Sequence, residues 1–87
     1  MGRDVQWHSS AWDEYCQWQS DKATLKRINA LIRDIQRDPF HGIGKPEPLR
    51  FDLSGLWSRR INDADRLTYC LKEDTLVIVS CKGHYSN

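Results

Sequence analysis

The first part of the chain carries apolar residues at helical spacing. In residues 10–38 this spacing predicts two helices that are separated near Ser20-Asp21. We expect Ser10 to cap the first helix and Asp21 to cap the second, because short polar side chains accept hydrogen bonds from the first free N–H groups of a helix. The apolar stripe of the second helix consists of Leu25, Ile28, Leu31, Ile32 and Ile35.

Two further local signals bound this helical region. Asp38-Pro39 is expected to end the second helix, because proline restricts the residue before it to extended conformations. Ahead of the first helix, Val5 and Trp7 alternate with polar neighbours. This alternation predicts a short N-terminal strand.

From Glu47 onward the pattern changes to a period of two, which is typical of strands. Turn residues at Ser54-Gly55, 62–65 and Glu73-Asp74 separate the alternating segments. We expect strands over residues 47–53, 57–61, 67–71 and 75–82, the last of them buried on both faces. Short turns between such strands predict an antiparallel meander. The expected fold class is therefore α+β: a short N-terminal strand, two helices, then an antiparallel β-meander packed on the helices.

The turn positions also predict which polar residues meet. A turn at Ser54-Gly55 brings Glu47 near Asn62, and the next turn returns Arg66 beside Ile61 or Asn62. The last turn brings Arg66 near Cys81, shortly before the end of the chain. The residues expected to gather at one end of the meander are Glu47, Arg60, Arg66, His84 and Tyr85.

Such a cluster suits chemistry on a phosphodiester. A carboxylate accepts a proton, arginines bind a phosphate and stabilise charge that develops on it, and a histidine returns a proton near neutral pH. Together these groups could transfer an RNA phosphodiester to its own 2′-hydroxyl without a metal. A surface salt-bridge network that ends at an exposed histidine is the alternative that the pattern alone leaves open.

Composition narrows the class of protein. The chain has 87 residues and a formal net charge of +1, which argues against a generally cationic nucleic-acid binder. Residues 39–72 nevertheless carry six cations and four anions, so that a modest basic focus lies there. No run of residues is long and apolar enough to predict a membrane span or a secretory signal.

The three cysteines, Cys16, Cys70 and Cys81, have neither metal-binding nor redox spacing. They are expected to be small core residues in a reducing environment, which predicts a cytoplasmic location. The histidines are equally scattered. We therefore expect no metal site and no cofactor.

Several sequence stretches resemble the YoeB toxins of bacterial toxin–antitoxin modules, within the RelE/ParE superfamily. The resemblance covers nearly the whole chain. Its most specific parts are Lys45-Pro46-Glu47-Pro48-Leu49 and Leu53-Ser54-Gly55-Leu56-Trp57-Ser58-Arg59-Arg60-Ile61. The other parts are Trp12-Asp13 to Trp18-Gln19, Ile28-Asn29-Ala30-Leu31-Ile32, Asp38-Pro39-Phe40, Arg66-Leu67-Thr68-Tyr69 and His84-Tyr85.

The resemblance implies a single toxin domain over residues 1–87 with a microbial-ribonuclease-like fold. It implies cleavage of mRNA in the ribosomal A site, and hence inhibition of translation. Glu47 then corresponds to the general base, Arg66 to the phosphate-stabilising cation, His84 to the general acid, and Tyr85 to a residue that positions or stacks on the substrate. The expected RNA or ribosome contacts are Lys45, Arg50, Arg59, Arg60 and Trp57.

The resemblance also implies partners. The bacterial ribosome, its mRNA and a YefM-type antitoxin are expected, a homodimer is left open, and operator DNA is expected to be contacted only through the antitoxin. The alternative function is that of a ParE-like toxin, which binds and inhibits a topoisomerase without catalysis. Such a binder does not need the carboxylate, arginine and histidine at the sheet end, and their presence favours the ribonuclease.

Overall fold

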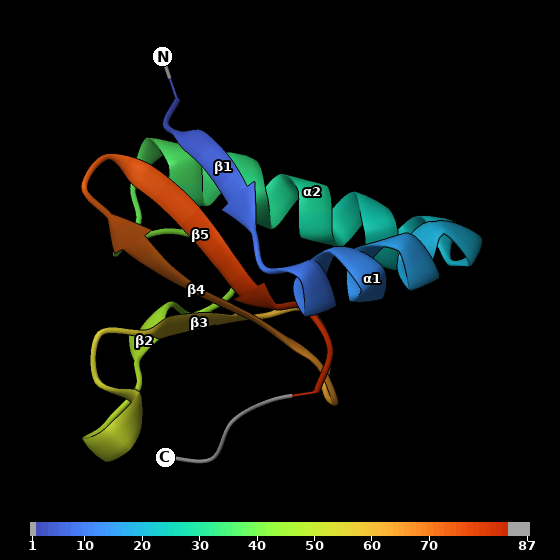
Figure 1. The fold of residues 1–87 in the computed structure, drawn as a ribbon. Coiled ribbons are helices and arrows are strands. Elements are labelled where there is room, and N and C mark those ends of the chain that lie inside the picture. The colour runs from blue at the N-terminus through green and yellow to red at the C-terminus, as the bar shows by residue number, and fades with distance from the viewer. Residues whose placement is uncertain (1, 84–87) are drawn as a thin grey trace.

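A five-stranded sheet packs against two helices, as the computed structural model of residues 2–83 shows (Figure 1). In chain order the elements are β1 (Asp4–Trp7), α1 (Ser9–Gln17), the 3-10 helix η1 (Trp18–Ser20), α2 (Lys22–Arg37), β2 (Glu47–Pro48), the 3-10 helix η2 (Phe51–Leu53), β3 (Trp57–Arg60), β4 (Arg66–Lys72) and β5 (Thr75–Ser80). The α+β class and the succession of strand, helices and meander are confirmed.

The sheet is mixed and has the strand order β1-β5-β4-β3-β2. From β2 to β5, strands that are consecutive in the chain pair antiparallel, as the meander predicts. β1 instead lies parallel to β5, with Val5 opposite Leu76 (Figure 1). Pairing of this kind requires that the chain cross over between the two strands, and the helices and the meander provide the crossover.

The two helix boundaries with clear signals are as predicted. The Asp21 side chain accepts a hydrogen bond from the Thr24 N–H at 3.0 Å and caps α2. α2 ends at Arg37, and Asp38 before Pro39 is extended. The cap predicted at Ser10 is wrong, because α1 begins at Ser9 and its N-cap, His8, makes no side-chain capping bond.

The core lies between α2 and the sheet. Ile28, Leu31 and Ile35 of α2 are completely buried, whereas Leu25 at the start of the predicted stripe is only half-buried. The sheet contributes residues that alternate along β4 and β5 and are also fully buried: Leu67, Tyr69, Leu76 and Ile78. The apolar stripe of α2 therefore covers one face of the two central antiparallel strands.

The cysteine prediction is confirmed at only one position. Cys81 is buried, and burial raises the pKa of its thiol to about 12. Cys70 is half-buried, and Cys16 is exposed because α1 fully buries only Ala11. Cys16 is therefore not a core residue.

The strand expected over residues 47–53 is wrong beyond its first two residues. β2 ends at Pro48, which has no N–H to donate to a neighbouring strand. Phe51 has a φ of 56° and starts η2, and the Leu49 N–H bonds to the Leu56 carbonyl at 2.9 Å to close the loop. Glu47 consequently lies opposite Ser58 and not near Asn62.

Two kinds of feature are absent from residues 2–83. Neither helix has the length and apolar character that crossing a membrane would require. No three His, Cys, Asp or Glu side chains gather in this part of the chain as metal ligands would.

Candidate active site

An ion pair joins two of the predicted site residues. Arg66 at the start of β4 places its Nη1 3.0 Å from Oε1 of Glu47 in β2. Ser58 of β3 lies between them, opposite Glu47 in the sheet, and its Oγ accepts a hydrogen bond from the same Nη1 at 3.1 Å. Side chains from three neighbouring strands thus meet on one face of the sheet, and the predicted approach of Glu47 to Arg66 is confirmed.

The pair is accessible to a ligand. The side chain of Glu47 is 49% exposed and that of Arg66 is 22% exposed. Both contacts of Arg66 use Nη1, so that its Nε and Nη2 have no partner among residues 2–83. A guanidinium with free donors can bind phosphate oxygens, and a half-exposed carboxylate can accept a proton from a bound hydroxyl.

The register around Arg66 differs slightly from the predicted one. Arg66 lies opposite Arg60, one residue before the predicted Ile61. A register shift between Thr68 and Tyr69 moves the partner of Arg66 past Cys81, into the segment that follows β5. The Arg66 N–H accordingly donates to the Gly83 carbonyl at 2.8 Å.

Gly83 is the last residue that the structure describes. Its own N–H donates to Asp65 Oδ1 at 2.8 Å, so that two hydrogen bonds hold it beside the start of β4. His84 and Tyr85 follow it in the sequence and lie outside the described residues. Their predicted roles remain predictions.

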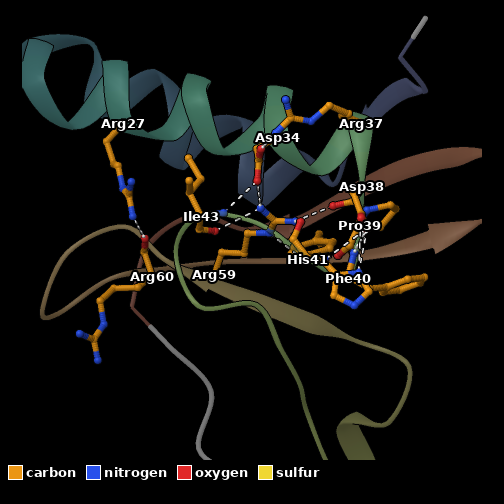
Figure 2. A network of polar contacts seen from close by, with 11 residues as sticks. Arg27, Asp34, Arg37, Asp38, Pro39, Phe40, His41, Ile43, Arg59 and Arg60 are labelled. Atoms are coloured by element: carbon orange, nitrogen blue, oxygen red, sulfur yellow. Dashed lines mark hydrogen bonds and ion pairs between the residues drawn. The ribbon is translucent and has the colours of Figure 1, made fainter.

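Four of the five expected RNA or ribosome contacts have accessible side chains. Lys45, Arg50 and Arg60 are exposed, and Trp57 is half-buried with its ring 4.8 Å from that of Phe40. Arg60 alternates with Arg59 along β3 and points away from the polar network under α2 (Figure 2). These four residues remain candidates for binding RNA.

The expectation that Arg59 contacts RNA is wrong. Its side chain is completely buried and faces α2, on the opposite side of the sheet from Arg60 (Figure 2). Neighbouring residues of a strand point to opposite faces, so that only one of these two arginines can face solvent. Arg59 instead forms an ion pair with Asp34 of α2, between Nη1 and Oδ2 at 2.5 Å.

All five N–H groups of the Arg59 guanidinium are used. Besides Asp34, the guanidinium donates to the Tyr69 hydroxyl at 3.2 Å. It also donates to three main-chain carbonyls of residues 38–43 (Figure 2). The carbonyls are those of Asp38 at 2.7 Å, His41 at 3.1 Å and Ile43 at 3.1 Å. The buried charge is therefore paired and fully hydrogen-bonded, as burial of a charge requires.

The network also changes the acidity of its members. Burial alone would raise the pKa of Asp34, but hydrogen bonds from Arg59 and the Ile43 N–H, together with the charges of Arg59 and Arg37, outweigh it and hold this pKa below its ordinary value. Burial raises the pKa of Tyr69 despite its contact with Arg59. Asp34 is therefore a carboxylate and Tyr69 a neutral phenol at neutral pH.

Two of the residues in these contacts, Ser58 and Asp34, were not predicted from the sequence. Ser58 lies within the recognised motif, but only the strand register places its hydroxyl against Arg66. Asp34 could have been found, because it lies three residues after Leu31, within the apolar stripe of α2. An acidic residue at such a position indicates a buried basic partner.

The fold is that of toxins from bacterial toxin–antitoxin modules, as solved structures show. Over 98% of this chain and 100% of the other, the YoeB dimer from Staphylococcus aureus matches with a TM-score of 0.89 and 39% identity. The YoeB–YefM complex from the same organism matches over the same shares with a TM-score of 0.88 and 38% identity.

The sequence comparisons narrow the class to one family. The family of the YoeB-like toxin of bacterial type II toxin–antitoxin systems matches residues 7–85. The toxin YoeB of Streptomyces coelicolor is 58% identical over 78 residues, which cover 88% of this chain and 93% of the relative. The chain belongs to the family of YoeB-like toxins.

Proposed function

We propose that this toxin is an endoribonuclease that cleaves mRNA on the ribosome and so stops translation. The observation that carries the proposal is the accessible Glu47–Arg66 pair at 3.0 Å, with Ser58 bonded to the same arginine nitrogen. At one end of the sheet, this pair places a proton acceptor, Glu47, next to a hydrogen-bond donor for phosphate oxygens, Arg66. Membership in the family, together with this geometry, supports RNA as the substrate.

In the proposed reaction the RNA supplies its own nucleophile. Glu47 takes the proton of a 2′-hydroxyl, whose oxygen then bonds to the adjacent phosphorus. Arg66 stabilises the negative charge that develops on the phosphate oxygens. The bond from phosphorus to the 5′-oxygen breaks, and His84 gives that oxygen a proton. Tyr85 positions or stacks on the substrate, and no metal or cofactor takes part.

The proposed partners follow from the same reading. Lys45, Arg50 and Arg60, which are exposed, and the half-buried Trp57 are the proposed contacts for RNA or the ribosome. A YefM-type antitoxin is proposed because the similar S. aureus protein was solved in complex with YefM. A homodimer is proposed because another S. aureus structure is of a YoeB dimer. Operator DNA is contacted only through the antitoxin complex, and the proposed location is the cytoplasm.

Mapping of mRNA 5′ ends in cells after induction tests the proposal directly. The expected result is new ends within translated codons, and a Glu47→Gln/Arg66→Ala double variant serves as the inactive control. Purified protein should cut mRNA on programmed ribosomes and cut free RNA only weakly, because its basic surface is too small to capture bare RNA at physiological salt. Efficient cleavage of free RNA that added ribosomes do not change would contradict the proposed dependence on the ribosome.

Mapping of mRNA ends also distinguishes the proposed nuclease from the alternative, a ParE-like toxin. Inhibition of a topoisomerase without new mRNA ends would identify a binder in place of a nuclease. A binder would also tolerate loss of the Glu47–Arg66 pair, whereas the nuclease would not.

A further inference from the structure

The segment that leads to Glu47 has no regular structure of its own. Residues 38–46, which we call the connecting loop, contain neither helix nor strand. Buried main-chain polar groups need hydrogen-bond partners, and in this loop buried side chains supply them. Arg59 donates to the carbonyls of residues 38, 41 and 43 (Figure 2). The Tyr69 hydroxyl donates to the carbonyl of Pro39 at 2.6 Å. The Ile43 N–H donates to Asp34 Oδ2 at 3.0 Å.

The far end of the loop is also held by β3. The Arg60 N–H donates to the Gly44 carbonyl at 2.7 Å, directly beside Arg59. Gly42 packs so closely on Asp34 that an added Cβ would collide with its carboxylate and lie 3.0 Å from Arg59 Nη1. The path of the loop is thus determined from residue 38 to residue 44.

Beyond the loop, Glu47 is held by its pairing with Ser58 in β3 and by the Leu49 N–H, which donates to the Leu56 carbonyl at 2.9 Å. This support is short. β2 has only two residues, and the second, Pro48, cannot donate to the sheet. The loop begins under α2 on one face of the sheet and delivers Glu47 to Arg66 on the other. A displacement of the loop would therefore move the carboxylate relative to Arg66.

We propose that Arg59 is a positioning residue, which acts with Asp34 and Tyr69 to hold the connecting loop so that Glu47 stays in contact with Arg66. The inference rests on the proposed function, in which Glu47 is the base. Stability by itself does not account for a buried arginine, because well-packed apolar residues in place of a buried ion pair are often equally stable. Five donors in a rigid planar group do account for it, since they determine the direction of three separate carbonyls.

Two variants perturb the hydrogen bonds that Arg59 and Tyr69 make to the connecting loop, while they keep most of the packing. Tyr69→Phe removes only the hydroxyl that joins Arg59 to Pro39. Arg59→Lys keeps a positive charge beside Asp34 but has three donors in place of five. Ile78→Val is the matched control, because it removes one methylene from a fully buried core residue outside the network.

Four measurements on the full chain distinguish positioning from stability. The first three are the thermal midpoint, the hydrogen-exchange rate of the Ile43 amide compared with amides of β4 and β5, and the rate of single-turnover cleavage on programmed ribosomes. The fourth is the side-chain ¹⁵N signal of Arg66, compared with the same signal in the Glu47→Gln variant. It reports whether Arg66 still contacts Glu47, and it does so independently of catalysis.

We expect Tyr69→Phe and Arg59→Lys to speed exchange at Ile43 and to shift the Arg66 signal toward that of Glu47→Gln. Cleavage should slow by about tenfold to a hundredfold, the usual cost of a small misplacement, while Ile78→Val lowers only the thermal midpoint. Unchanged exchange and an unchanged Arg66 signal in folded Tyr69→Phe would overturn the inference, whether or not Arg59→Lys folds. A shifted Arg66 signal with wild-type cleavage would leave the positioning role standing and would instead refute Glu47 as the base.

Discussion

Replacing Arg66 with alanine should separate activity from stability. In the proposed reaction Arg66 stabilises charge that appears only in the transition state. Loss of one such donor typically costs about 3–4 kcal/mol, or two to three orders of magnitude in rate. We expect Arg66→Ala to be the most damaging single change. Glu47→Ala and His84→Ala should each slow cleavage by roughly a hundredfold to ten-thousandfold as acid–base losses.

The stability cost of the same change should be small. The Glu47 side chain is 49% exposed and that of Arg66 is 22% exposed, so that water and salt screen their ion pair. Exposed pairs of this kind contribute about 0–1 kcal/mol. For a domain of this size that corresponds to a fall in thermal midpoint of at most about 4–8 °C. Arg66→Ala should therefore remain folded while it loses nearly all activity.

Single-turnover cleavage of mRNA on programmed ribosomes measures the rate, and circular dichroism measures the midpoint of unfolding. Lys72→Ala is the matched control, since Lys72 is an exposed cation at the other end of the same strand. It should change neither quantity. A folded Arg66→Ala protein with a rate near that of the wild type would refute the catalytic role of Arg66. The Glu47–Arg66 pair would then be a surface salt bridge.

Four further predictions concern the network and the partner surface. Asp34→Asn should lower the free energy of unfolding in urea by about 3–5 kcal/mol, because it leaves the buried Arg59 charge unpaired. Folding lowers the pKa of Asp34, so the Asp34 carboxylate stabilises the fold at pH values above its unfolded pKa of about 3.9. This stabilisation is lost as the pH falls below that value. The wild type should therefore lose stability in acid more steeply than Asp34→Asn. Gly42→Ala should destabilise more than Gly55→Ala in the same urea assay, because both have positive φ but only Gly42 has Asp34 in the way of a Cβ; equal losses would contradict this. A YefM-type antitoxin should protect basic residues of the catalytic end from chemical crosslinking, and protection confined to the outer face of residues 22–38 would rule this out. The residues expected to be protected are Lys45, Arg50, Arg60 and Arg66.

The local signals in the sequence were sufficient for the elements. Asp21 caps α2 and Asp38-Pro39 ends it, because each acts on its own backbone within a few residues. The apolar stripe of α2 and the alternation in β4 and β5 identify core positions for the same reason. The motif around Glu47 and Arg66 identified the family. The turn positions predicted that these two residues approach each other, although with Asn62 in place of Ser58 as the partner of Glu47.

Only the tertiary structure determined how β2 and β3 pair and to which face of the sheet Arg59 and Arg60 point. Residues 49–56 close a loop in place of continuing a strand, which moves the partner of Glu47 from Asn62 to Ser58. Arg59 and Arg60 are chemically identical neighbours, and a shift of one residue in the pairing of β3 would exchange the buried one for the exposed one. Asp34 determines which of the two is buried. It lies on the face of α2 that packs against the sheet, and it stabilises the one arginine that points toward it. That choice depends on a contact between residues 25 positions apart, which no local pattern in the sequence contains.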